Sequence, residues 1–141
     1  MALTRGRKLA PDLPKVCGDP IQVQQVLVNL VSNAFEAIAA AQPASPTVVI
    51  ETVDTSDAGV EFRVTDNGEG IDPERLGKVF DAYFSTRAGG MGMGLAISRT
   101  IVEALEGQIT VTSQPGVKTT FRFNLPGGFD DDHESHSLHC R

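Results

Sequence analysis

The sequence is poor in the residues that secretion, membrane insertion and aromatic stacking require. Tryptophan is absent, tyrosine occurs once, and the two cysteines, Cys17 and Cys140, stand near opposite ends of the 141 residues. Such a pair makes no disulfide framework and no C-x-x-C site, and aromatic stacking is not expected as the mode of ligand binding. No apolar run approaches the roughly 20 residues of a membrane span, and no signal peptide opens the chain. We therefore expect a cytoplasmic protein that makes no membrane contact of its own.

Basic residues are outnumbered as well. The chain has 12 Lys and Arg residues against 18 Asp and Glu residues, which gives a net charge of −6. An acidic surface suits neither nucleic acid nor an anionic membrane, so neither is expected as a partner. With 40% apolar residues, the chain has enough hydrophobic material for one globular domain.

Composition divides the chain into three parts. Residues 1–8 are basic and without a pattern, and we expect them to be a disordered end or a linker stub. Residues 9–126 carry regular hydrophobic patterns and are expected to form one domain. Residues 127–141 are acidic and polar, which is typical of a disordered tail.

The patterns in the middle part predict an α+β fold. The expected elements are an edge strand or extended lead-in over 9–16, a long helix over 20–42, strands over 47–53 and 60–65, a helical turn over 73–76, a loop over 80–93, a helix over 94–106 that Gly107 stops, and a hairpin over 108–113 and 118–125. Together they predict a two-layer sandwich. Its sheet is mostly antiparallel, with about five strands, and about three helices cover one face.

The long helix has an unusual polar side. Asp19 is suited to the N-cap and Pro20 to the first helical position. Opposite the apolar face, a narrow stripe carries amides and a single carboxylate: Gln22, Gln25, Asn29, Asn33 and Glu36. A solvated helix face is one interpretation, although such faces are normally rich in Lys and Glu. The other is a set of oxygen ligands for a hard cation such as Mg²⁺.

A glycine-rich segment follows the strand expected over 60–65. Residues 66–70 read Asp-Asn-Gly-Glu-Gly, but no strand follows to complete a hairpin, and the spacing of a calcium loop is not met. The functional interpretation makes Asp66 a buried hydrogen-bond acceptor. Gly68 and Gly70 would then let a flat ligand lie against bare backbone.

A second glycine-rich segment, residues 90–95, opens the helix expected over 94–106. Backbone N–H groups at a helix N-terminus, free of side chains, can bind an anion such as phosphate. The spacing is G-x-G-x-G, which matches neither the P-loop nor the dinucleotide-binding motif. Taken alone, this segment is equally well interpreted as a flexible linker.

Taken together, these segments resemble the catalytic ATP-binding domain of sensor histidine kinases. The superfamily, which has the Bergerat ATP-binding fold, includes Hsp90, type II topoisomerases and MutL. Asp19 with residues 25–37 is similar to its N box, residues 66–71 to the G1 box, residues 79–87 to the F box and residues 90–95 to the G2 box. The end of the chain's last hairpin also resembles the family's final box. The resemblance covers residues 12–126 and is strongest to oxygen-sensing and nitrogen-regulating kinases of the rhizobial type.

The resemblance implies a site for ATP and Mg²⁺. Asp66 would accept a hydrogen bond from the adenine amino group, Asn33 would hold the Mg²⁺, and Arg87 would contact the phosphates. Asn29, Asn33 and Arg87 are the residues implied for catalysis. The implied nucleotide-binding set is Asn29, Asn33, Glu36, Ala37, Asp66, Gly68, Gly70, Ile71, Phe80, Thr86, Arg87, Gly90, Gly92, Gly94, Leu95 and Thr119.

The implied reaction is transfer of the γ-phosphoryl group to a histidine on a separate dimerisation domain, with a response regulator as an indirect partner. ATP-hydrolysing relatives have a glutamate where Asn29 stands, and an amide cannot act as a general base. Residues 1–132 contain no histidine, and His133, His136 and His139 lie in the expected tail. We therefore expect a fragment or module of a longer kinase, with little turnover alone.

Two residues depart from the family's usual pattern, and alternative functions stay open. Lys118 stands where a glycine usually precedes Thr119, and Arg87 stands where the F box commonly has lysine. The alternatives are an ATPase of the same superfamily, a serine kinase of the anti-sigma type and a non-catalytic binding module.

Overall fold

The structure, a computed structural model, describes residues 4–8, 19–55, 59–81 and 94–126. Within these ranges the elements are β1 (Thr4–Lys8), α1 (Pro20–Ala41), β2 (Thr47–Asp54), β3 (Val60–Asp66), α2 (Pro73–Leu76), α3 (Gly94–Ala104), β4 (Gln108–Gln114) and β5 (Lys118–Leu125). The strands form one sheet in the order β1-β2-β3-β5-β4. Only β1 and β2 pair in parallel among these strands. The predicted fold class and mostly antiparallel sheet are confirmed.

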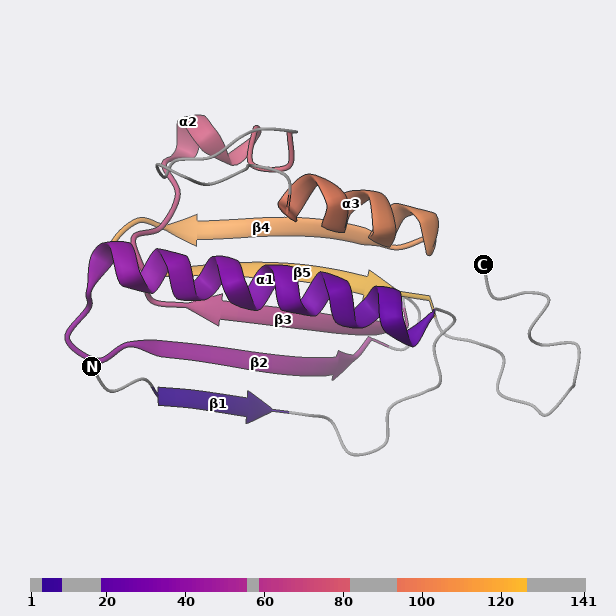
Figure 1. Cartoon of the computed structure of the whole chain (residues 1–141), viewed down its shortest axis with the longest axis horizontal. Helices are drawn as coiled ribbons and strands as arrows, with labels where there is room; N and C mark the ends of the chain where they lie inside the picture. The colour runs from indigo at the N-terminus through magenta and orange to yellow at the C-terminus, as the bar shows by residue number, and fades with distance from the viewer. Residues whose placement is uncertain (1–3, 9–18, 56–58, 82–93, 127–141) are drawn as a thin grey trace, which may run out of the picture.

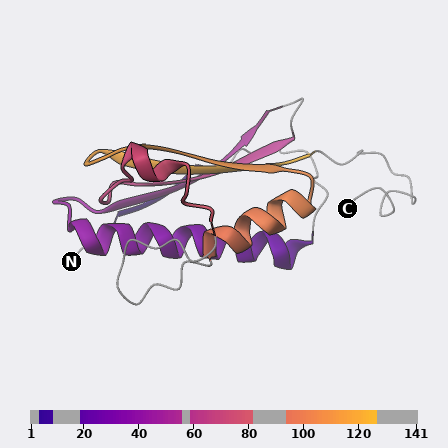
Figure 2. The ribbon, with the colours of Figure 1, turned by 90° about the horizontal axis from the view of Figure 1, so that it is seen from above.

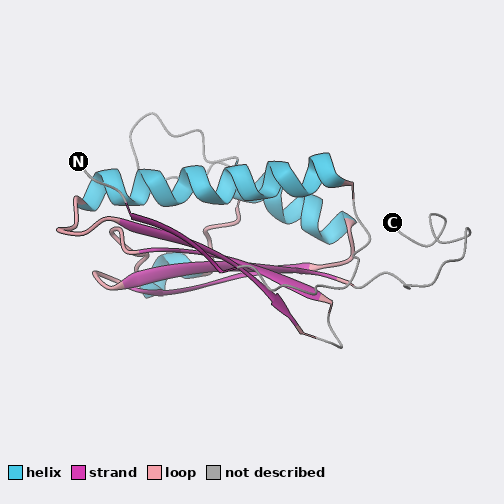
Figure 3. Ribbon diagram, turned by 90° about the horizontal axis from the view of Figure 1, so that it is seen from below, coloured by secondary structure: helices cyan, strands magenta, loops and turns pink. Residues whose placement is uncertain are grey.

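The two longer helices lie side by side on one face of the sheet (Figures 2 and 3). Helix α1 runs along β3 and β5, and α3 lies next to it toward β4 (Figure 1). The short helix α2 lies beside β4, at the edge of the sheet, and not over the face. The predicted two-layer arrangement is therefore confirmed, with two helices on the covered face and the third at its border.

The N-terminal strand β1 was not expected at these residues, since an edge strand was considered only over 9–16. Residues 1–8 were predicted to be a disordered end or linker stub, but Thr4–Lys8 pairs in parallel with β2, from Thr4 opposite Thr47 to Lys8 opposite Glu51. That part of the prediction is wrong. An edge strand is joined to its neighbour by backbone hydrogen bonds, so it needs no alternating side-chain pattern. The edge strand or lead-in predicted over 9–16 and the tail predicted over 127–141 lie outside the described residues.

Helix α1 begins and ends close to the predicted residues. The carboxylate of Asp19 accepts a hydrogen bond from the Ile21 N–H at 2.9 Å, and Pro20 occupies the first helical position. At the other end, Gln42 adopts a left-handed φ of 50° and donates its N–H to the Ile38 carbonyl at 2.7 Å. None of the helices in the described ranges is long and apolar enough to cross a membrane.

Helix α3 ends in a way that the sequence did not reveal. Gly107 was expected to stop the helix, but the left-handed φ of 66° belongs to Glu106. A Cβ on Gly107 would lie 1.9 Å from the Asn124 carbonyl oxygen of β5. Glycine is therefore needed at 107 because the chain passes close to β5, and the turn itself is made by Glu106.

The hydrophobic core lies between the helices and the sheet. The buried members of this core are Val26, Leu30, Ala34, Ile38, Val48, Val64, Ile101, Val102, Leu105, Phe121, Phe123 and Leu125. Phe62 and Phe123 stack with ring centroids 4.7 Å apart, and Phe80 meets Phe121 edge-on at 6.1 Å. The alternation along β3 and β5 thus directs aromatic and aliphatic side chains toward α1 and α3.

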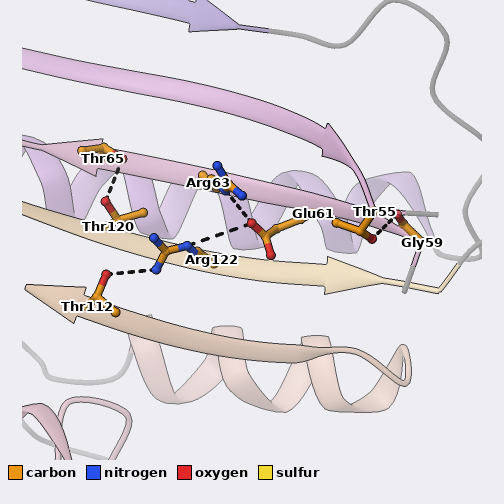
Figure 4. A network of polar contacts seen from close by, with 8 residues as sticks. All are labelled: Thr55, Gly59, Glu61, Arg63, Thr65, Thr112, Thr120 and Arg122. Carbon is orange, nitrogen blue, oxygen red and sulfur yellow. Dashed lines mark hydrogen bonds and ion pairs between the residues drawn. The ribbon is translucent and has the colours of Figure 1, made fainter. Parts of the chain in front are cut away.

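The opposite face of the sheet is polar (Figure 4). Arg63 forms an ion pair with Glu61, and Arg122 donates a hydrogen bond to the Thr112 hydroxyl at 2.9 Å. The hydroxyls of Thr65 and Thr120 lie 2.9 Å apart across β3 and β5. Since these residues alternate with the core residues of the same strands, the two faces of the sheet have distinct characters.

Candidate functional site

One row of α1 connects the segments that the sequence singled out. Asn29, Asn33 and Ala37 follow one another at intervals of four residues, so they lie on the same side of the helix. At 1.5 Å per residue, the row is about 12 Å long. Its first residue contacts the start of α3 and its last contacts the loop after β3. Asn33 stands between the two contacts.

Asp66 is the last residue of β3 and is 2% exposed. Its Oδ1 accepts a hydrogen bond from the Gly68 N–H at 2.8 Å. In the β3–β5 register Asp66 stands opposite Thr119, and directly opposed residues of an antiparallel pair share a face. The predicted burial of Asp66 is confirmed.

The two glycines after Asp66 are required by packing within the chain. A Cβ on Gly68 would lie 2.5 Å from the carbonyl carbon of Ala37, and one on Gly70 would lie 2.6 Å from the Pro115 Cα. Gly70 also has a φ of +80°. Packing within the chain is thus one reason for glycine at these positions, and the predicted approach of a flat ligand to their backbone stays a prediction. These glycines allow the loop to contact α1 and the β4–β5 turn.

Asn67 holds the same loop to the start of β2. Its Oδ1 accepts from the Thr47 N–H at 2.8 Å, and its Nδ2 donates to the Ser45 carbonyl at 2.8 Å. Asn67 was predicted only as part of the glycine-rich motif, with no contact of its own. An Asn-Gly pair after a strand, with no second strand following, was the available signal for such an anchor.

A series of hydroxyl groups links the loop to the last hairpin. The Ile71 N–H donates to the Ser113 Oγ at 2.9 Å, and this Oγ lies 2.7 Å from the Thr119 Oγ1. Thr119 is buried and stands opposite Asp66. The predicted site residues Ile71, Thr119 and Asp66 are therefore neighbours. Ser113 was not predicted as a site residue, although it lies between two that were.

Asn29 is joined to α3. Its Nδ2 donates to the Gly94 carbonyl at 3.2 Å and to the Ser98 Oγ at 3.1 Å. Ser98 is completely buried. Asn29 was predicted as a catalytic and nucleotide-binding residue, and Ser98 was not predicted as a site residue. The Gly-to-Ser spacing of four residues, one helical turn, was the signal available.

The remaining predicted residues divide into three groups. Asn33 is half-buried and Glu36 is exposed, on the same part of α1. Phe80 and Leu95 are partly buried against the hydrophobic core. Thr86, Arg87, Gly90 and Gly92 lie outside the described residues, so their roles stay predictions.

The donor chemistry of the described residues fits ATP and Mg²⁺. Asn29 and Asn33 offer amide oxygens one turn apart, and Mg²⁺ is usually bound by one or two protein oxygens together with water and substrate phosphates. The buried carboxylate of Asp66 is a suitable acceptor for an amino group of a base. An N-terminus of a helix, that of α3, lies against the same side of α1.

These features are those of an ATP-binding α+β domain, and comparison with known proteins identifies its family. Residues 18–128 match the family described as "Histidine kinase-, DNA gyrase B-, and HSP90-like ATPase". The match covers most of the chain, so the protein belongs to this family. The expected resemblance to sensor histidine kinases is confirmed by the relatives below.

Two curated relatives are sensor proteins. The chain is 40% identical to the sensor protein FixL of Bradyrhizobium diazoefficiens over 118 residues, which are 84% of this chain and 23% of FixL. It is 43% identical to the sensor histidine kinase ZraS of Escherichia coli K12 over 114 residues, which are 81% of this chain and 23% of ZraS. The chain thus spans about a quarter of these relatives' length.

Solved structures agree with this assignment. The catalytic domain of the histidine kinase ThkA superposes with a TM-score of 0.75 at 28% identity, covering 89% of this chain and 79% of ThkA's. Full-length ShkA, solved in complex with AMPPNP, gives a TM-score of 0.75 at 26% identity, covering 89% of this chain and 26% of ShkA's.

Proposed function

We propose that this chain is the ATP-binding catalytic domain of a sensor histidine kinase. In this proposal it binds Mg-ATP and donates the γ-phosphoryl group to a histidine on a separate dimerisation domain. The observation that carries the proposal is the buried carboxylate of Asp66, which begins a loop that contacts Ala37 at the end of the α1 row containing Asn29 and Asn33. ATP as phosphate donor places the reaction in the cytoplasm.

Asp66 selects the base in this proposal. A carboxylate can accept the amino hydrogen that adenine carries at C6, whereas guanine has an oxygen there. With guanine, two acceptors would face each other in a buried place, and an unpaired buried polar group costs about 1–3 kcal/mol. The domain should therefore bind ATP in preference to GTP.

The amide row of α1 binds the phosphate end of ATP in this proposal. Asn33 would hold the Mg²⁺, with Asn29 beside it and Arg87 contacting the phosphates. Bound there, the metal ion supplies positive charge that offsets the charge of the phosphate groups. Because Asn29 is an amide, it cannot activate water as a general base. The chain's own residues therefore act by positioning ATP, which favours transfer to a protein group over hydrolysis.

The phosphate acceptor belongs to another part of the kinase. In this proposal the dimerisation domain and the sensor region are separate from the matched part, which spans about a quarter of FixL and ZraS. A response regulator would take the phosphoryl group from the acceptor histidine and would not contact this domain's nucleotide directly.

Phosphotransfer to a separate acceptor tests the proposal. The chain is mixed with Mg-ATP labelled at the γ-phosphate and with a histidine-bearing dimerisation domain, and acid-labile phosphate on that domain is measured. We expect label on the acceptor, none on a His→Ala acceptor, and little released phosphate from the chain alone. Steady phosphate release without acceptor would instead support the ATPase alternative, and absence of nucleotide binding would support a non-catalytic module.

A further inference from the structure

We propose that Ser98 is a positioning residue, which orients the amide of Asn29 so that its oxygen faces the nucleotide's metal ion. The proposal rests on the proposed binding of Mg-ATP. It adds Ser98, which is not among the predicted site residues. Ser98 does not need to touch the ligand. It would act through Asn29, from the neighbouring helix.

The hydrogen bonds around Asn29 define the orientation of its amide. The Gly94 carbonyl, 3.2 Å from Nδ2, can only accept, so the nitrogen of the amide must face α3. The second amide hydrogen is directed to the Ser98 Oγ at 3.1 Å. Both donors are therefore used by α3, and Oδ1 is the polar atom that remains for other partners.

The position of Ser98 supports a specific role for its hydroxyl. The residue is completely buried, and a buried hydroxyl without a partner would destabilise the fold. Gly94 and Ser98 lie one turn apart on α3, so their acceptors form a pair that matches the two hydrogens of one NH₂ group. A carbonyl alone would hold one hydrogen and leave the amide freer to rotate.

The orientation matters because the two ends of an amide have opposite chemistry. An amide oxygen can coordinate Mg²⁺ or accept a hydrogen bond from its bound water, whereas an amide NH₂ cannot be a ligand. Asn33 lies one turn from Asn29 in the same row. Fixing the nitrogen of Asn29 on α3 would thus place a second oxygen near the metal ion that Asn33 holds.

The affinity for AMPPNP, measured by calorimetry with Mg²⁺ and again with EDTA, tests this role. The ratio of the two affinities is the gain due to magnesium. We expect Ser98→Ala to reduce that gain by about 3- to 10-fold, the effect of one hydrogen bond, and to leave the affinity in EDTA unchanged. In Asn29→Ala protein, the same Ser98 substitution should have no further effect on the gain.

A matched control comes from the same helix. Thr100 is exposed on α3, and its hydroxyl donates to the Ala96 carbonyl at 3.1 Å, within the same helix. Thr100→Ala should leave both affinities unchanged. If Ser98→Ala fails to fold, Ser98→Cys keeps the shape of the side chain with a slightly larger and weaker acceptor, and the gain should also fall.

The outcomes separate this proposal from the proposed function. An unchanged gain in Ser98→Ala, or an equal loss with and without Mg²⁺, would overturn the positioning role while ATP binding stands. A further loss in the Asn29→Ala background would show that Ser98 acts by another route and would also overturn it. If the unmodified chain binds no AMPPNP in either condition, the proposed function itself fails, and the role of Ser98 fails with it.

Discussion

Asp66 combines burial with a local backbone hydrogen bond, and this makes it the sharpest test at the scale of a residue. Asp66→Asn replaces one acceptor oxygen by a donor, which would face the amino group of adenine. We expect ATP affinity to fall by about 10-fold or more, equivalent to about 1.4 kcal/mol. Calorimetry with Mg-ATP measures the change.

The control for this prediction lies on the other face of the sheet. Thr65 is the preceding residue of β3 and faces Thr120, away from the helices. Thr65→Val should leave ATP affinity unchanged, because it alters β3 without reaching the site. Equal affinities of Asp66→Asn and the unmodified chain, with both folded, would remove Asp66 from base recognition.

Gly68 is expected to be essential to the fold. Gly68→Ala places a Cβ within 2.5 Å of the backbone of Ala37, so α1 and the loop must separate. We expect a loss of about 3 kcal/mol or more in the free energy of unfolding, measured by urea denaturation. Gly77→Ala is the matched control. Nothing lies within 4 Å of a Cβ on Gly77, so its effect should stay within about 0.5 kcal/mol.

The site residues that the sequence revealed are those whose chemistry can be read from residue type and motif. Asp66 was predicted to be buried because a carboxylate directly followed a β-branched strand, and it is buried. The contacts of Asn67 and Ser98 could not be predicted in the same way. Their partners, Ser45 and Asn29, are distant in sequence and meet only after the helices pack on the sheet.

At the scale of the element, the capping of α1 gives a measurable prediction. Asp19 accepts a capping hydrogen bond from the Ile21 N–H, whereas Asp72, at the equivalent position before α2, makes no such bond. We expect Asp19→Ala to reduce the free energy of unfolding by about 1 kcal/mol, measured by thermal denaturation. Asp72→Ala should change it by much less. Equal losses of unfolding free energy in the two variants would show that the capping hydrogen bond of Asp19 does not contribute to stability.

The elements themselves were largely predictable, for a physical reason. Hydrophobic periodicity over long stretches indicated α1, α3 and the four antiparallel strands, with boundaries within a few residues of those observed. β1 was missed at residues 4–8 because a short edge strand needs only backbone partners. The end of α3 was misread, since a left-handed Glu106 depends on the approach of Gly107 to β5, which local sequence does not encode.

At the scale of the whole molecule, the two faces of the sheet differ. The helix-covered face holds the hydrophobic core, Asp66 and the amide row of α1. The open face holds the polar network around Glu61, Arg63 and Arg122. Nucleotide binding should therefore affect only the helix-covered side of the sheet. Residues of the open face should not contact the nucleotide.

Mapping of amide chemical shifts in the ¹⁵N-labelled chain, on addition of Mg-AMPPNP, tests this division most directly. The largest changes are expected at Asn33, Asp66 and Gly94, three residues far apart in sequence that α1 brings to one side of the molecule. Arg63 and Thr112 on the open face should change little. Changes concentrated on the open face, or none at the three named residues under saturating nucleotide, would contradict the proposed site.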